Sequence, residues 1–117
     1  MQERRKEQRS RAVVNIGVYD LQTKEQVGQL VDMSTEGIML VGGQKMKLNT
    51  VYQFKIVFPI AIYKDREISF TAVCLWSEKD TGDSGYQAGF QLHNVEPDLK
   101  KLLKCLIQGP AFEENSG

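Results

Sequence analysis

Short runs in which apolar and polar residues alternate make up most of this 117-residue chain, and they constrain its fold more than any other feature. Alternation with a period of two predicts β-strands that bury one face. Residues rich in Gly, Pro, Asp and Asn separate the runs, so we expect hairpin connections and antiparallel pairing. The runs number six and span residues 12–20, 26–33, 37–41, 51–58, 67–77 and 86–92.

The period changes once, near the end of the chain, where leucines recur at the spacing of one helix face. Pro97 and Asp98 suit the start of this helix, and Gly109 followed by Pro110 suits its end. We therefore predict an all-β fold with one C-terminal helix. The expected architecture is a six-stranded antiparallel β-barrel of split or Greek-key type, or a strongly curled sheet, with the helix across an opening or flank. The leucines are Leu99, Leu102, Leu103 and Leu106.

The length favours a single domain. We expect a flexible basic arm at 1–11, a barrel with its helix at 12–109, and a frayed tail at 110–117. No apolar run approaches the roughly 18 residues of a membrane helix, so membrane insertion is not expected. Cys74 and Cys105 form no disulfide or metal motif, which favours a reducing cytoplasm and no metal site.

Charge is balanced over the whole chain but concentrated at its start. Fifteen Lys and Arg residues balance fifteen Asp and Glu residues, which excludes a protein that coats nucleic acid by global charge. Residues 1–11 nevertheless carry five basic and two acidic side chains, and they contain four of the five arginines. An arginine fork grips a carboxylate, a phosphate or a base edge at two points. Any anion site is therefore expected to be local.

Two motifs are expected to meet at one corner of the fold. They are RxxxR, from Arg5 to Arg9, and DxSxxG, from Asp32 to Gly37. If 12–20 pairs with 26–33 as a hairpin, the numbers of facing residues sum to about 45 or 46, which places Arg9 near residues 36 and 37.

The residue types in these motifs suit a guanine-bearing anion. An arginine fork matches O6 and N7 of guanine, and the carboxylate of Asp32 can accept from the N1 and N2 hydrogens. Ser34 could donate to a phosphate or base atom. Gly37 could adopt a positive φ or let a flat base approach the backbone.

At these residues the sequence resembles the PilZ domain family of bacterial cyclic di-GMP receptors. Both hallmark motifs occur in order, with 22 residues between Arg9 and Asp32. The resemblance covers residues 3–107. It includes Glu3-Arg4-Arg5 before the first motif, Val73-Cys-Leu-Trp76, and Gly85-Tyr-Gln-Ala-Gly-Phe90.

The resemblance implies a non-enzymatic receptor whose ligand is cyclic di-GMP, with no other cofactor. It implies that ligand binding orders the arginine arm against the barrel and so signals to an unidentified protein effector, in motility or exopolysaccharide regulation. Glu7, an acidic residue between the motif arginines, could weaken affinity slightly. The ligand-binding residues implied are Arg4, Arg5, Arg9, Asp32, Ser34 and Gly37.

Two other functions compete with this one. A PilZ-like interaction module could have lost nucleotide binding, although both motifs are intact. An RNA or single-stranded DNA binder would use exposed aromatic residues for stacking. The alternation of these residues instead indicates a core, so nucleic acid is not favoured as a partner. His93 is the single histidine and has no recognisable nucleophile near it in sequence, so no catalytic residue is assigned. The aromatic residues expected in the core are Phe54, Phe58, Phe70, Trp76 and Phe90.

Overall fold

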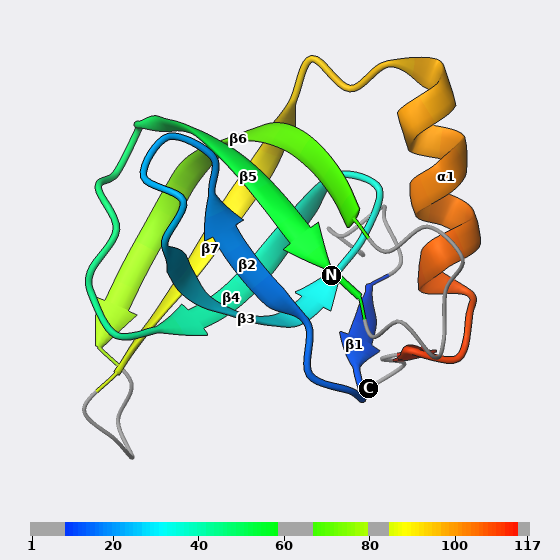
Figure 1. The fold of residues 1–117 in the computed structure, drawn as a ribbon, viewed down its shortest axis with the longest axis horizontal. Helices are drawn as coiled ribbons and strands as arrows, with labels where there is room; N and C mark the ends of the chain where they lie inside the picture. Colours follow the sequence, from blue (N-terminus) through cyan, green and yellow to red (C-terminus); the bar gives the residue numbers. More distant parts are fainter. Residues whose placement is uncertain (1–8, 59–66, 80–84, 115–117) are drawn as a thin grey trace, which may run out of the picture.

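The computed structural model describes residues 9–58, 67–79 and 85–114, and these residues form strands and one helix (Figure 1). The elements are β1 (Ser10–Ala12), β2 (Gly17–Asp20), β3 (Gln26–Met33), β4 (Gly37–Gly42), β5 (Val51–Val57), β6 (Glu67–Lys79), β7 (Tyr86–His93), α1 (Pro97–Ile107) and β8 (Phe112–Glu114).

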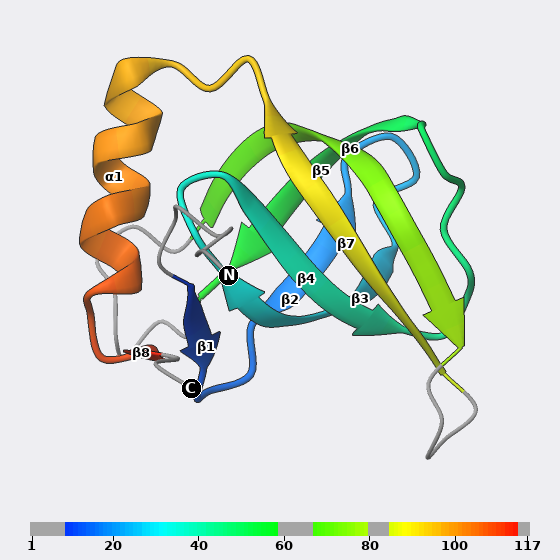
Figure 2. The ribbon, with the colours of Figure 1, turned by 180° about the vertical axis from the view of Figure 1, so that it is seen from behind.

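Six of the strands close into an antiparallel barrel, which confirms the predicted fold class. The order is β2-β5-β6-β7-β4-β3, and pairing of β2 with β3 closes the ring. β1 pairs with the C-terminal end of β3, and β8 pairs with β1. Figure 2 shows β1 and β8 beside the barrel, on the side where α1 stands. We call this pair of short strands the β1–β8 extension.

The run expected as one strand at 12–20 is two strands. β1 ends at Ala12 and β2 begins at Gly17, and both pair with β3. Between the pairs Arg11↔Asp32 and Gly17↔Gln29, the first segment has five residues and β3 has only two. The excess residues leave the ladder, so Arg9 comes closer to Ser34 than to residues 36 and 37. The expected register was wrong there by about three residues.

The ends of the chain also differ from the expectation. Ser10 and Arg11, which we assigned to the flexible arm, belong to β1, and Phe112 to Glu114 form β8 rather than a frayed tail. Phe112 is buried, with its ring centroid 6.4 Å from that of Phe58. Burial of this side chain and pairing with β1 order the segment. Strands of three residues are too short for periodicity to reveal.

The barrel interior is filled by the predicted alternating residues. Phe54 has no exposed surface, and its ring lies 5.0 Å from Phe90 in an edge-to-face arrangement and 5.4 Å from Tyr52 in a stacked one. Phe58 and Phe70 are also buried. The interpretation of these rings as core, rather than as stacking platforms, is confirmed for all the listed aromatic residues except Trp76.

Trp76 lies on the outer face of the barrel, which corrects its assignment to the core. The register between β6 and β7 shifts between Cys74 and Trp76. Cys74 is therefore buried, while Trp76 is only half-buried and Ser77 takes the next inward position. One extra residue in a bulge moves every later side chain to the opposite face.

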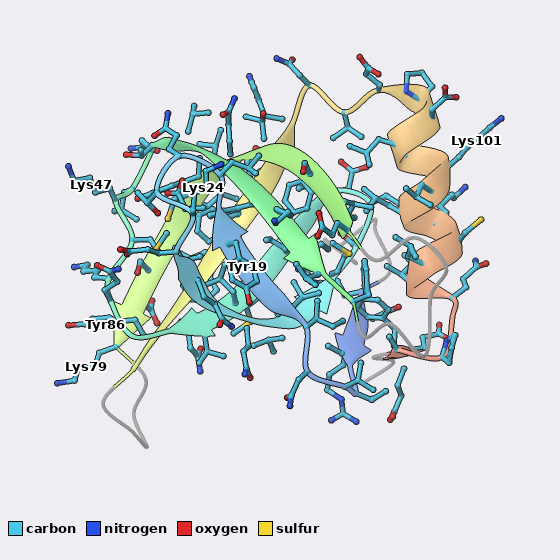
Figure 3. The ribbon with its side chains drawn as sticks, viewed as in Figure 1. Tyr19, Lys24, Lys47, Lys79, Tyr86 and Lys101 are labelled. Atoms are coloured by element: carbon cyan, nitrogen blue, oxygen red, sulfur yellow. The ribbon has the colours of Figure 1, made fainter. Side chains whose placement is uncertain are left out.

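The helix forms where the sequence predicts it. Leu103 and Leu106 are buried in the main core cluster, and Leu99 and Leu102 pack against it. Lys101 points away from the barrel (Figure 3). Within the described part of the chain, α1 is too short and too polar to span a bilayer, and no other helix is present there.

Candidate functional site

The DxSxxG motif forms the turn between β3 and β4, and Ser34 shapes it. The Ser34 hydroxyl oxygen accepts hydrogen bonds from the backbone N–H groups of Glu36, at 3.0 Å, and Gly37, at 3.1 Å. The backbone N–H of Ser34 donates to the carbonyl of Gly37 at 2.9 Å. Ser34 is fully buried. Its observed role is therefore to hold the turn, and direct contact with a ligand stays a prediction.

Gly37 is required by close packing of two strands. A Cβ atom at this position would lie 2.4 Å from the carbonyl oxygen of Phe90 on β7. Its φ is not positive, which excludes one of the two suggested roles of Gly37, and close approach of a flat base stays a prediction. A side chain here would push β4 away from β7 and displace the turn that Ser34 holds.

Arg9 and Asp32 meet at this end of β3, so the two motifs lie together as expected, although not in the expected register. Nε of Arg9 donates to Oδ1 of Asp32 at 2.9 Å, and a terminal guanidinium nitrogen donates to the same oxygen at 2.5 Å. The side chains are 17% and 13% exposed, respectively. An ion pair this shielded from water is stronger than one on an open surface. The other two predicted arginines, Arg4 and Arg5, lie outside the described residues.

Asp32 belongs to a row of directly paired residues that crosses the outer face of the sheet. Paired residues in antiparallel strands place their side chains on the same face. Asp32 therefore shares its face with Arg11 on one side and with Met39 on the other. The row runs from β8 to β6 through Glu113, Arg11, Asp32, Met39, Gly89 and Trp76.

The two ends of this row were missed by sequence reasoning. At one end, Arg11 donates to Oε2 of Glu113 at 2.9 Å. At the other, Trp76 lies against Gly89, where a Cβ atom would be 2.2 Å from Nε1 of the indole. A glycine within a strand, opposite an aromatic residue, was the available signal for this packing.

A contact with the helix ties the motif turn to α1. The backbone carbonyl of Glu36 accepts from the N–H of Leu92 at 2.8 Å, and the Glu36 carboxylate lies 3.5 Å from Nζ of Lys100. Both side chains of this ion pair are about half exposed. The turn therefore contacts both the end of β7 in the barrel and α1.

Within residues 9–58, 67–79 and 85–114, no group of three His, Cys, Asp or Glu residues is placed to hold a metal. His93 is exposed at the end of β7. Burial raises the pKa of the Cys74 thiol, and a smaller contribution from a backbone hydrogen bond with Trp76 lowers it. Cys74 is therefore a protonated core residue at neutral pH.

The PilZ domain family model matches residues 3–109. The chain belongs to the PilZ domain family. A search of curated proteins found no match.

Solved PilZ structures share the fold of the chain at low sequence identity. The PilZ domain of YcgR from Escherichia coli with c-di-GMP aligns with a TM-score of 0.68 and 16% identity, covering 91% of this chain and 90% of that one. MotI/DgrA, the inhibitor of motility of Bacillus subtilis, gives 0.70 and 17%, covering 92% and 51%. The K. pneumonia MrkH–c-di-GMP complex gives 0.74 and 16%, covering 92% and 52%. This PilZ chain thus spans about half the length of MotI and MrkH.

Proposed function

We propose that this PilZ domain is a receptor for cyclic di-GMP and that Arg9 and Asp32 recognise a guanine base. The observation that carries the proposal is the pairing of a guanidinium fork with a carboxylate on one outer face of the barrel. Guanine presents two acceptors on one edge and adjacent donors on another. It can therefore engage both side chains, whereas adenine offers Asp32 no matching pair of donors. The structural neighbours YcgR and MrkH, solved with c-di-GMP, support the same ligand.

The row of outward residues supplies the rest of the proposed site. Met39 and the half-buried indole of Trp76 continue from Asp32 across β4, β7 and β6. An aromatic face beside a charged pair can stack a base and contributes about 1–3 kcal/mol where it does so. Ser34 and Gly37 keep the turn in place beneath this surface, and Arg4 and Arg5 are proposed to add phosphate and base contacts from the arm.

We propose that ligand binding acts on a protein effector through the arm and involves no catalysis. Arg9 immediately precedes β1, so a ligand that engages Arg9 restrains the chain that leads into it. Ordering of a charged segment by a ligand is coupled folding and binding. The effector is unidentified, and its process is proposed to be motility or exopolysaccharide control. The setting proposed is the bacterial cytoplasm, where this second messenger acts.

Calorimetric titration of the full chain tests the ligand assignment. Cyclic di-GMP should bind with clear preference over cyclic di-AMP and GTP. Arg9→Ala and Asp32→Ala should each weaken binding by roughly ten- to a hundredfold, as expected for loss of a bidentate base contact. Arg5→Lys should weaken it too, because lysine lacks the fork.

The matched control is Lys47→Ala, which removes an exposed cation at the end of the barrel far from α1 and the β1–β8 extension (Figure 3). This variant should retain wild-type affinity. Equal affinity of the wild-type chain for the guanine and adenine dinucleotides would contradict the proposal. Absence of any binding would favour the interaction module instead.

Hydrogen exchange separately tests the proposal that ligand binding orders the N-terminal arm. Amides of residues 1–11 should exchange more slowly when cyclic di-GMP is present, and those of β5, which contributes no residue to the proposed site, should not change. Binding without any added protection in residues 1–11 would leave the receptor assignment standing and remove the arm from the signal.

A further inference from the structure

Arg11 shares the candidate site's face but belongs to neither hallmark motif. Its Cα partner in β3 is Asp32, so the two side chains lie on the same side of the sheet. Arg9 and Arg11 are two residues apart on an extended segment, a spacing that places both side chains on one face. The guanidinium of Arg9 is already bound to Asp32. Arg11 is therefore the next cation along the same surface.

Arg11 is held by a carboxylate from the other end of the chain. One of its terminal nitrogens donates to Oε2 of Glu113 at 2.9 Å, across the pairing of β1 with β8. The side chains are 55% and 59% exposed. A guanidinium has five N–H donors, and this contact uses one of them. An ion pair this open to water contributes little stability, so a competing anion can replace it.

A recess of about 380 Å³ lies beside Arg11, within the size range of small-molecule sites. It is mixed in character, because the valine side chains form apolar walls while the amides of Asn15 and Gln29 offer donors and acceptors. Such a lining suits a heterocyclic base attached to an anionic group. The recess is formed by Arg11, Ala12, Val13, Val14, Asn15, Gln29, Leu30, Val31 and Val41.

We propose that Arg11 is a further ligand-binding arginine, beyond Arg4, Arg5 and Arg9, which contacts a phosphate of the dinucleotide at this recess, and that Glu113 competes for it in the unliganded chain. The inference rests on the proposed function, because it assigns a phosphate group of the same ligand. On binding, the phosphate takes the place of the Glu113 carboxylate, so Arg11 exchanges one anion for another. β8 thereby lowers the affinity of a site to which it contributes no ligand contact.

Titration of four full-length variants with cyclic di-GMP tests the exchange. Arg11→Gln should weaken binding about three- to tenfold, because a charge-assisted contact is lost. Glu113→Gln should strengthen it about two- to fivefold, because the competing carboxylate is gone. The double variant should bind as Arg11→Gln does, since Glu113 acts only through Arg11. Glu67→Gln is the matched control.

Glu67 is paired with Lys55 and is 53% exposed, so its substitution removes the same charge and also breaks an ion pair, but on β6. Glu67→Gln should leave affinity unchanged. If Glu113→Gln binds no more tightly than Glu67→Gln, or if Arg11→Gln binds as the wild type does, the inference is overturned.

The two proposals fail in different ways. If substitution of Arg11 or Glu113 leaves the affinity at the wild-type value while Arg9→Ala abolishes binding, the receptor assignment stands and the role of Arg11 is removed. A wild-type chain that does not bind cyclic di-GMP removes both. Thermal unfolding of each variant without ligand should give midpoints close to that of the wild type, because Arg11 and Glu113 are exposed. This measurement separates loss of binding from loss of fold.

Discussion

The barrel and the β1–β8 extension are held together by different forces. In the barrel, Phe54, Ile56 and Val18 have no exposed surface and the strands close on themselves. The extension consists of two three-residue strands joined to the barrel through one end of β3. Its side-chain contacts include the exposed Arg11–Glu113 ion pair and the packing of Phe112. The barrel therefore depends on many buried apolar side chains, whereas the extension combines one buried ring with an exposed ion pair.

Asp32 stands at the boundary between these regions. It is near the end of β3, where it pairs with Met39 of the barrel on one side and with Arg11 of the extension on the other. A ligand bound there contacts both regions at once. In the proposed function, such a ligand would rearrange the extension and the arm while the barrel stays closed.

The largest effect expected on this comparison is that of Phe54→Ala in the barrel. Loss of a fully buried ring that contacts Tyr52, Phe70 and Phe90 should lower the free energy of unfolding by about 3–5 kcal/mol. Urea denaturation measures it. Val51→Ala, on the same strand but 57% exposed, is the control and should change stability by less than about 0.5 kcal/mol. If both variants lowered the free energy of unfolding by similar amounts, burial in the barrel interior would not be the main source of stability.

The barrel could be predicted from the sequence because its signal is repeated in every strand. Phe54, Phe70 and Phe90 alternate with polar residues, and this pattern depends only on the pleat of each strand. Trp76 was misassigned because a single bulged residue reverses the alternation, and nothing in the local pattern marks the bulge. Periodicity therefore predicts the fold class, but it does not predict on which face of the sheet the residues that follow a bulge lie.

The candidate site could be predicted in part. Contacts between residues close in sequence could be predicted, and contacts between residues far apart in sequence could not. Arg9 and Asp32 are 23 residues apart and are brought together by one hairpin, which local turn signals reveal. Arg11 and Glu113 are 102 residues apart. Their contact depends on the whole path of the chain through β2 to β7 and α1. No local sequence pattern around either residue predicts that the other is its partner.

The next largest effect is expected at the turn that joins the two regions. Ser34→Ala removes the oxygen that accepts from two backbone N–H groups in a buried turn. Leaving these donors without that acceptor should lower the free energy of unfolding by about 1–3 kcal/mol. It should also weaken cyclic di-GMP binding, because Asp32 and Gly37 flank the turn.

Ser69→Ala, which removes an exposed hydroxyl from β6, is the control for both measurements. It should alter neither stability nor affinity. Normal stability of Ser34→Ala together with lost binding would mean that Ser34 contacts the ligand directly and does not act by shaping the turn. If Ser34→Ala had wild-type stability and wild-type affinity, the turn would have no role in ligand binding.

The smallest effect is expected in the extension, and it decides whether the two regions are energetically separate. Glu113→Gln breaks an exposed ion pair, so it should lower the free energy of unfolding by only about 0.2–1 kcal/mol at low ionic strength. In about 1 M salt, where charges are screened over roughly 3 Å, the difference from wild type should disappear. Denaturation at both ionic strengths measures this. A loss of several kcal/mol that persists in high salt would mean that β8 is part of the cooperative core, and a ligand could not then release Arg11 without opening the barrel.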